Sequence, residues 1–247
     1  MEPGKVDLHC HLAYGVSDGP PEPEISLRMI DAAEAAGVKY INAVAHSGPW
    51  FDEVRAAVEF LRGRTGGKIE LHPGVEYDFD DLSAAEFVPV TVGDNSPFFL
   101  LDFNSRVLPP EAGVRLAELA ARGYRAIVVH PEVLFGPSEV ATLAGLRESG
   151  ALFQLNAASF LPEASGGVRN MAVKLLEAEL GDMIASDAHR DRGRRRYAIA
   201  EAGLRVSKRF GAEAAETLFS GNPARVLRGE EPERPRLRRR KFFGLFS

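Results

Sequence analysis

The chain has 247 residues, of which 45% are hydrophobic, and carries a formal net charge of −5. That length and composition suffice for one sizeable core, which excludes an intrinsically disordered or fibrous protein. No apolar run approaches the ~20 residues of a membrane-spanning helix, and the first residues do not read as a signal peptide. With one cysteine, no intrachain disulfide is possible, so we expect a cytoplasmic protein.

The charge is unevenly distributed along the chain. Residues 229–247 hold six basic and three acidic residues, a net +3, while the other 24 basic and 32 acidic residues give 1–228 a net −8. The acidic body disfavours nucleic acid as a partner. The basic residues at 236–241 are followed by aromatic ones, a pattern suited to weak contact with the inner face of a membrane. We therefore expect one domain at 1–228 and a tail at 229–247 that is either disordered or associated with a membrane surface.

Strands and helices are predicted to alternate through the domain. The first helix, for example, has an apolar stripe at Ile25, Met29, Ile30 and Ala33, followed by Gly37 as a C-cap. The predicted strands are 5–9, 40–45, 69–75, 87–92, 98–103, 125–129, 152–155 and 183–185, and the predicted helices are 24–36, 51–61, 110–122, 138–148, 168–180, 197–210 and 212–219. This alternation indicates an α/β protein with a mainly parallel sheet.

Imidazole and carboxylate side chains recur where the predicted strands end. They are His9, His11, His46, Glu76, Asp102, His130, Asp187 and His189. Some seven such strand ends favour a closed barrel over an open sheet, and in a parallel barrel the site lies where the strands end. We therefore expect all eight side chains to meet at one rim.

Imidazole together with carboxylate is a ligand set for Zn, Mn or Fe. Five histidines with Asp18, Glu76, Asp102 and Asp187 exceed the needs of one ion, so two or three ions are expected, with Glu76 as a bridging ligand. Clustered divalent ions make hydroxide at neutral pH and neutralise a phosphoryl group under in-line attack, so no protein nucleophile is needed. This chemistry indicates a metal-dependent phosphomonoesterase.

Cys10 invites a different hypothesis, a cysteine-dependent phosphatase. That chemistry requires a thiolate in a C-x5-R phosphate loop, and the residue six positions after Cys10 is Val16. By strand alternation Cys10 points away from His9 and His11, so we expect it to be buried and unreactive.

Short motifs along the chain carry a family resemblance. They are D-L-H-C-H at 7–11, G-V-S-D-G-P at 15–20, A-V-A-H-S at 43–47, P-G-V-E at 73–76, L-L-D-F at 100–103, H-P-E-V at 130–133, Q-L-N-A-A-S at 154–159 and A-S-D-A-H at 185–189. In this order, from about residue 5 to 228, they resemble the PHP (polymerase and histidinol phosphatase) superfamily. Within it, the chain most resembles the manganese-dependent protein-tyrosine phosphatases encoded with bacterial capsule and exopolysaccharide genes.

The resemblance implies a PHP-type distorted (β/α)7 barrel, similar to a TIM barrel, with two to three ions, Mn²⁺ in the first place and Fe or Zn as alternatives. It implies metal ligation by His9, His11, Asp18, His46, Glu76, Asp102, His130, Asp187 and His189. It also implies a phosphotyrosine protein as substrate, a bacterial tyrosine kinase of capsule or exopolysaccharide synthesis. Catalytic roles are expected for Asp18 and His46 at the ions and for Arg192 and Arg196 beside the phosphate.

The chain departs from the family pattern at three positions. Ser47 replaces a second histidine, Asp102 replaces a glutamate, and Val133 replaces an arginine that the family is thought to use for phosphate. Two alternatives therefore stay open: a histidinol-phosphatase-like or other small-molecule phosphatase, and an inactive metal-binding interaction module. A homo-oligomer is compatible with either function.

Overall fold

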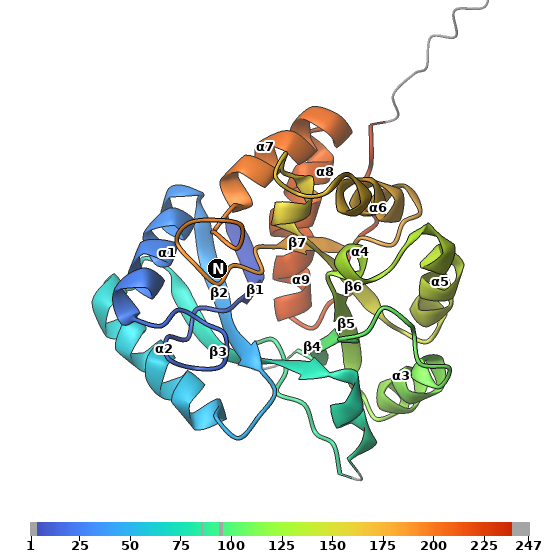
Figure 1. Ribbon diagram of the computed structural model, residues 1–247, viewed down its shortest axis with the longest axis horizontal. Helices are drawn as coiled ribbons and strands as arrows, with labels where there is room; N and C mark the ends of the chain where they lie inside the picture. Colours follow the sequence, from blue (N-terminus) through green and yellow to red (C-terminus); the bar gives the residue numbers. More distant parts are fainter. Residues whose placement is uncertain (1–3, 85, 94–95, 239–247) are drawn as a thin grey trace, which may run out of the picture.

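A computed structural model describes residues 4–84, 86–93 and 96–238 of the chain. Its centre is a sheet of seven parallel strands whose order in space is their order in sequence (Figure 1). The strands are β1 Lys5–Cys10, β2 Val38–His46, β3 Glu70–Asp78, β4 Phe98–Asp102, β5 Arg125–Val129, β6 Leu152–Asn156 and β7 Met183–Ala185. A parallel bridge between Cys10 and Ala188 brings the first strand beside the segment after the last, so the barrel is nearly closed. The α/β barrel predicted from the alternation is confirmed.

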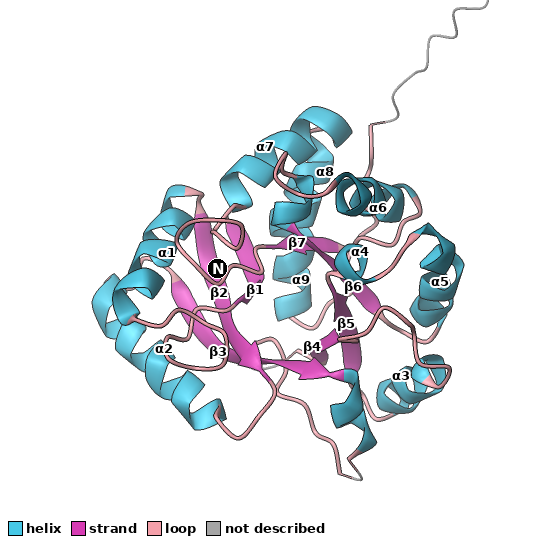
Figure 2. Cartoon of the chain, in the orientation of Figure 1, coloured by secondary structure: helices cyan, strands magenta, loops and turns pink. Residues whose placement is uncertain are grey.

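Helices pack around the strands, most of them on the outside of the barrel and α9 at one end of it (Figure 2). They are α1 Pro23–Ala35, α2 Phe51–Thr65, α3 Ala112–Ala121, α4 Pro131–Leu134, α5 Val140–Glu148, α6 Gly166–Glu177, α7 Ile199–Phe210, α8 Ala212–Glu216 and α9 Asn222–Leu227. The charged residues of α2 suit the helix dipole. Asp52 and Glu53 lie in the first turn, and Arg62 and Arg64 lie in the last.

One predicted strand, 87–92, is wrong, because the described part of this segment is irregular. Pro89 has no backbone N–H to give to a sheet, and the N–H of Val90 instead donates to the Tyr77 hydroxyl at 2.9 Å. Phe87 packs edge-on against Tyr77 and Phe99. Phe87 therefore covers the outside of the barrel and Val92 packs with side chains of its inner face, without an eighth strand being formed.

Two apolar clusters fill the two faces of the sheet. The inner one joins side chains of the strands, such as Leu8, Val44 and Leu100, to Val226 and Leu227 of α9. The outer cluster packs the opposite strand faces against the surrounding helices. Because α9 lies beneath the starts of the strands, it closes the N-terminal end of the barrel and leaves the C-terminal end for polar side chains.

Residues 229–238, the described part of the predicted tail, have no regular secondary structure and pack against the barrel. Glu233 exchanges two 2.7 Å hydrogen bonds with the side chain of Asn222, and Leu237 packs against the outer cluster. Residues 239–247 lie outside the described residues. Within the described part of the chain, no helix has both the length and the apolar character needed to cross a membrane.

Candidate metal centre

Most strand-end side chains reach the barrel interior by regular alternation. In β2, β4 and β6 the even-numbered residues belong to the inner face, so His46, Asp102 and Asn156 lie at its C-terminal end. Glu76 of β3 pairs in register with His46 and points the same way. These residues share one rim, as the sequence predicts.

A β-bulge in β1 changes the direction in which the side chains of His9 and His11 point. Leu8 belongs to the inner cluster, so plain alternation would point Cys10 inward and both His9 and His11 outward. Between Asp7 and Cys10, however, three steps along β1 match two steps along β2. The extra residue reverses the alternation, so both imidazoles face the interior while Cys10 packs in the outer cluster.

His130 reaches the interior by a different device. Val129 is part of the inner cluster, so its successor would normally point outward. The backbone of His130 is left-handed (φ 36°, ψ 44°), a conformation that costs about 1–3 kcal/mol for a residue other than glycine. This turn brings its Nε2 to 3.0 Å from Oε1 of Glu76. Asp187, after β7, is also left-handed, with φ 48°.

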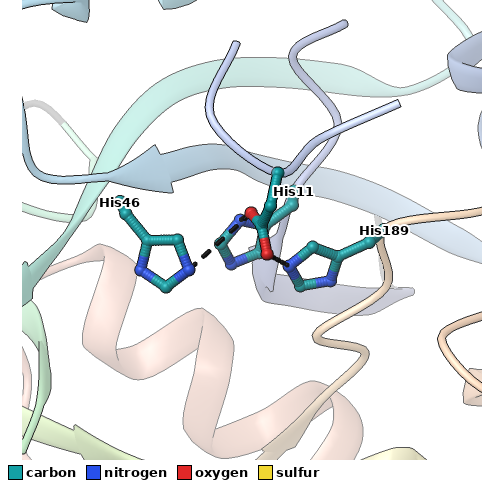
Figure 3. A group of neighbouring side chains, drawn as sticks. His11, His46 and His189 are labelled. Carbon is teal, nitrogen blue, oxygen red and sulfur yellow. Dashed lines mark ion pairs between the residues drawn. The ribbon is translucent and has the colours of Figure 1, made fainter. Parts of the chain in front are cut away.

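One group of potential ligands gathers at the outer side of the rim. His11, His46 and His189 surround the carboxylate of Asp18, with ligand atoms within 4.8 Å of one another. Asp18 lies 3.2 Å from His11 Nδ1, 3.1 Å from His189 Nε2 and 3.7 Å from His46 Nε2. Figure 3 shows the three imidazoles converging from separate segments of the chain.

Glu76 links two further groups, one with His9 and His11 and one with Asp102 and His130. Its Oε2 lies 3.2 Å from His9 Nε2 and 2.9 Å from His11 Nε2, while Oε1 faces His130. The Asp102 carboxylate is 4.0 Å from the His130 ring. Since His11 and Glu76 each belong to two groups, the three groups form one continuous centre.

Two amide side chains beneath the centre fix the orientation of its ligands. The Gln154 side-chain carbonyl accepts a 2.8 Å hydrogen bond from His9 Nδ1, so Nε2 of the same ring faces the cluster. Gln154 then donates to Asn156, which donates to Asp187 at 2.5 Å. Asp187 in turn lies 3.5 Å from His9 Nε2 and 3.7 Å from His11 Nε2. Sequence reasoning gave Gln154 no role of its own, although its two-residue spacing from Asn156 on a buried strand places both on one face.

The carboxylates and imidazoles of the centre shift one another's pKa values. Burial alone would lower the pKa of His9, but the Glu76 and Asp187 carboxylates raise it to about 9. The same balance raises the pKa of His130 to about 10. Burial would raise the pKa of Glu76, yet the surrounding imidazoles hold it well below its usual range. Burial and the nearby cations lower the pKa of His189 to about 4. The interior therefore holds ionised carboxylates that attract positive charge.

The donor set fits divalent cations. Four buried atoms of the centre lie close to oppositely charged groups but make no well-aligned hydrogen bond within the described residues: His11 Nδ1, Asp18 Oδ1, Glu76 Oε2 and His130 Nδ1. In addition, Nε2 of His9 lies only 3.0 Å from Nε2 of His11, and two such nitrogens require a proton or a cation between them. Nitrogen and carboxylate oxygen are the ligands that Zn, Mn and Fe prefer.

Two of the arginines after the last histidine reach the centre: Arg190 donates to the backbone carbonyls of Asp18 and His189, and Arg195 contacts side chains. The guanidinium of Arg195 donates to Asp18 at 2.9 Å and also contacts the ring of His189. Arg196, by contrast, pairs with Glu201 at 2.7 Å, and Arg192 is exposed. The geometry thus favours Arg195 over the two arginines that the sequence singled out.

A cavity of about 700 Å³ adjoins the centre. It is mainly apolar, and its lining includes Val133, Asn156, Leu161, Val168 and Arg196. Asn156 connects it to the ligands through its bond to Asp187. Val133, which stands where the family has arginine, is 44% exposed. The volume of the cavity is sufficient for an aromatic group next to the candidate ligands.

Three other polar or reactive residues near the centre are buried, and their contacts are with the protein backbone and neighbouring side chains. Cys10 is fully buried, and burial raises the pKa of its thiol well above the usual value, which disfavours the thiolate that a nucleophile needs. Asp7 accepts hydrogen bonds from the backbone N–H groups of Ser186 and His9, which ties the ends of β7 and β1 together. Glu132 is buried and accepts two hydrogen bonds from the segment at the end of β6.

The chain is similar to known proteins over nearly its whole length. It is 28% identical over 265 residues to the tyrosine-protein phosphatase YwqE of Bacillus subtilis (strain 168), covering 98% of this chain and 100% of that protein. It is 24% identical to the tyrosine-protein phosphatase CpsB of Streptococcus pneumoniae, covering 90% and 98%. A solved structure from a study of YwqE and CpsB, described as unique metal-dependent tyrosine phosphatases, superposes with a TM-score of 0.81 at 26% identity, covering 95% of this chain and 100% of that one.

The family model for capsular polysaccharide synthesis proteins CpsB/CapC matches residues 5–228, which is all of the barrel from β1 to the end of α9. The sequence resemblance to the capsule-associated phosphatases is therefore confirmed. This chain belongs to the CpsB/CapC family of capsular polysaccharide synthesis proteins.

Proposed function

We propose that the protein is a metal-dependent protein-tyrosine phosphatase that acts on a tyrosine kinase of capsule or exopolysaccharide synthesis. The observation that carries this proposal is the overlap of three ligand groups through His11 and Glu76 at the open end of the barrel. Overlapping groups hold ions close together, which is the arrangement that phosphoryl transfer uses. The names of the aligned relatives and of the superposed structure support the same activity.

The ligands in this proposal are the nine residues expected from the sequence: His9, His11, Asp18, His46, Glu76, Asp102, His130, Asp187 and His189. Two or three ions are proposed, with Mn²⁺ as the first candidate and Fe or Zn as alternatives. When bound, such ions supply the hydrolytic nucleophile from water and neutralise charge on the phosphoryl group.

The protein side chains orient the substrate around this centre. Asp18 and His46 are about one-third exposed and form the side of the centre that a phosphate can approach. In this proposal Arg195, which Asp18 and His189 hold in position, binds non-bridging phosphate oxygens with its remaining N–H groups. The tyrosyl ring enters the apolar cavity beside Asn156.

The test is hydrolysis of a phosphotyrosine peptide by chelator-treated protein reloaded with Mn²⁺, Fe²⁺, Zn²⁺ or Mg²⁺. Turnover should depend on the metal and disappear in His9→Ala, whose ring lies inside the centre. Activity of metal-stripped His9→Ala would contradict the mechanism. Preference for histidinol phosphate over the peptide would indicate a small-molecule phosphatase. Full metal occupancy without turnover of p-nitrophenyl phosphate would indicate an inactive binding module.

Arg195→Gln tests the phosphate contact, with Arg192→Gln as the matched control in the same loop. Loss of one charge-assisted, bidentate contact that strengthens in the transition state should lower kcat/KM about 100-fold. The control should stay within about twofold, since within the described residues Arg192, unlike Arg195, makes no hydrogen bond or ion pair with the centre. Equal effects of both substitutions would show that the loop acts only by its net charge.

Contact of the tail with the inner face of a membrane is also part of this proposal. If the kinase is bound to a membrane, such contact would bring the enzyme to the surface that holds its substrate. Self-association of the chain remains a prediction.

A further inference from the structure

A second cavity, of about 580 Å³, lies where the short turn Ala157–Phe160 packs against both α6 and α7. Five cationic side chains line this basic cavity: Arg169, Arg205, Lys208, Arg209 and Arg238. Among its described lining residues there is no aspartate or glutamate. Because residues 1–228 carry a net charge of −8, this concentration of positive charge is local and opposite in sign to that of the domain.

Carboxylates near the basic cavity neutralise only part of its charge. Glu201 lies 3.5 Å from Arg205 but also pairs with Arg196 at 2.7 Å, so two cations share it. Glu177 lies 4.0 Å from Arg209, at the limit of an ion pair. The other three cations of the cavity form no ion pair with any described residue. The cavity therefore keeps a positive potential that attracts anions.

Backbone carbonyls hold two of the unpaired guanidinium groups in place. Arg169 donates through one terminal nitrogen to the carbonyl of Pro162, at 2.8 Å, and to that of Ala164. Arg238 donates to the carbonyl of Lys208 at 3.0 Å. A neutral carbonyl fixes the position of a guanidinium without cancelling its charge, and both groups keep further N–H donors that make no hydrogen bond within the described residues. The cavity thus offers positioned donors for carboxylate or phosphate oxygens.

The basic cavity borders the apolar cavity beside the metal centre. Ser159 lines both of them, and α6 borders both as well, with Val168 on the apolar cavity and Arg169 on the basic one. Ser159 follows Asn156 by three residues, so their Cα atoms are at most about 11 Å apart. Asn156 lines the apolar cavity and donates to the Asp187 carboxylate at 2.5 Å. A substrate that reaches the metal centre through the apolar cavity therefore has the basic cavity beside it.

The lining of the basic cavity suits a peptide better than a small anion. Its five cations come from α6, α7 and residue 238, which is more than one phosphate group can contact, whereas several carboxylates along a peptide can each meet a cation. Phe160 and Val173 also line the cavity and offer apolar contact to the aliphatic part of peptide side chains. A protein substrate necessarily extends away from its phosphotyrosine over the neighbouring surface. The occupant that fits is thus an acidic stretch of the same substrate.

We propose that the basic cavity binds an acidic segment of the substrate protein, so that the enzyme selects phosphotyrosine sites flanked by aspartate or glutamate. This inference rests on the proposed phosphatase function and names the sequence class of its substrate. An extended peptide advances about 3.3 Å per residue, which places the acidic residues about three to six positions from the phosphotyrosine. The cavity does not touch the reacting atoms, so the selection acts through KM.

The test compares two phosphotyrosine peptides that carry either glutamate or glutamine at those flanking positions. The wild type should favour the glutamate peptide about tenfold in kcat/KM at low ionic strength, and added salt should reduce the difference. Lys208→Gln/Arg209→Gln should lower this preference about fivefold through the KM of the glutamate peptide, since each exposed ion pair is worth about two- to fivefold. The matched control is Arg55→Gln/Arg64→Gln, which removes two exposed cations from α2, on another side of the barrel (Figure 1).

A charge reversal distinguishes direct contact from a change in folding. Lys208→Glu/Arg209→Glu should bind a lysine-flanked peptide more tightly than the glutamate peptide, an outcome that a merely structural role of these side chains would not produce. Thermal melting verifies that each variant is folded. Equal kcat/KM of the wild type for the glutamate and glutamine peptides, or an equal loss of preference in the α2 control, overturns the inference even if both peptides are hydrolysed.

Binding without turnover separates this inference from the proposed function. Fluorescence anisotropy with the same two peptides, carrying a non-hydrolysable phosphonate in place of the phosphate ester, measures their Kd directly. A preference for the glutamate peptide that disappears in Lys208→Gln/Arg209→Gln supports the acidic-peptide site, whether or not the protein hydrolyses p-nitrophenyl phosphate. Equal Kd values for the two peptides contradict it, whereas absence of turnover with every metal contradicts only the proposed function.

Discussion

Glu76→Gln is the most informative single change in the metal centre, because Glu76 contacts His9, His11 and His130 with one fully buried carboxylate. In metal-free protein the substitution removes the main partner of two imidazolium groups. A shift of the His9 pKa from 6.5 to about 9 corresponds to about 3 kcal/mol at pH 7. We therefore expect the metal-free variant to lose about 3 kcal/mol of unfolding free energy at that pH.

The loss of unfolding free energy in Glu76→Gln should decrease as the pH rises. Because the folded-state pKa values of His9 and His130 are raised, to about 9 and about 10, their stabilisation is complete below pH 6.5 and disappears as the pH rises through those values. The difference between wild type and Glu76→Gln should thus be largest near pH 6 and close to zero near pH 10.

Urea unfolding of chelator-treated protein, followed by circular dichroism at pH 6, 7.5 and 10, measures this difference. Glu70→Gln is the matched control on the same strand, since Glu70 pairs with His72 at 2.9 Å but is largely exposed, where an ion pair is worth ~0–1 kcal/mol. A pH-independent loss, or a loss as large in Glu70→Gln, would refute the reasoning. After metal loading, Glu76→Gln should also contain fewer ions per chain by elemental analysis, because Glu76 belongs to two ligand groups.

Three further changes test neighbouring features. Metal loading at pH 7 should release protons from His9 and His130, so apparent affinity should rise from pH 6 to pH 9; calorimetry in buffers of different ionisation enthalpy measures the release. Gln154→Leu should lower metal affinity about 10–100-fold in a chelator competition, because it removes the partner that fixes the His9 ring. Cys10→Ala should keep kcat within about twofold, because the Cys10 thiol is buried and its pKa is raised. Loss of turnover at full metal content would instead support Cys10 as the nucleophile.

The barrel could be predicted from the sequence because its signal is distributed over many residues. Seven buried strands separated by amphipathic helices leave few other arrangements, and errors at single ends did not change the outcome. The failure at 87–92 was local: the apolar run resembles a strand, but Pro89 lacks an N–H and Val90 bonds to a side chain. Such a segment is distinguished from a strand only by its tertiary partners.

The arginine beside the centre could not be chosen from sequence, since five arginines lie between 190 and 196. The choice depends on how the loop folds back. The N–H of His189 donates to the carbonyl of Arg195 at 2.9 Å, and Arg190 forms a bridge with Arg196. That closure brings Arg195 beside Asp18 and turns Arg196 toward Glu201. The spacing of the arginines along the chain does not predict this closure of the loop.

The sequence predicts that these histidines lie at strand ends, but it does not predict the direction in which their side chains point. Strand periodicity carried forward from Leu8 and Val129 would send His9, His11 and His130 into the helix layer, where unpaired imidazoles would be costly. One inserted residue in β1 and one left-handed residue after β5 reverse this. Both devices cost backbone regularity, and both occur where a ring nitrogen meets Glu76. The candidate centre therefore departs from regular strand geometry at the places where its imidazoles converge on the Glu76 carboxylate.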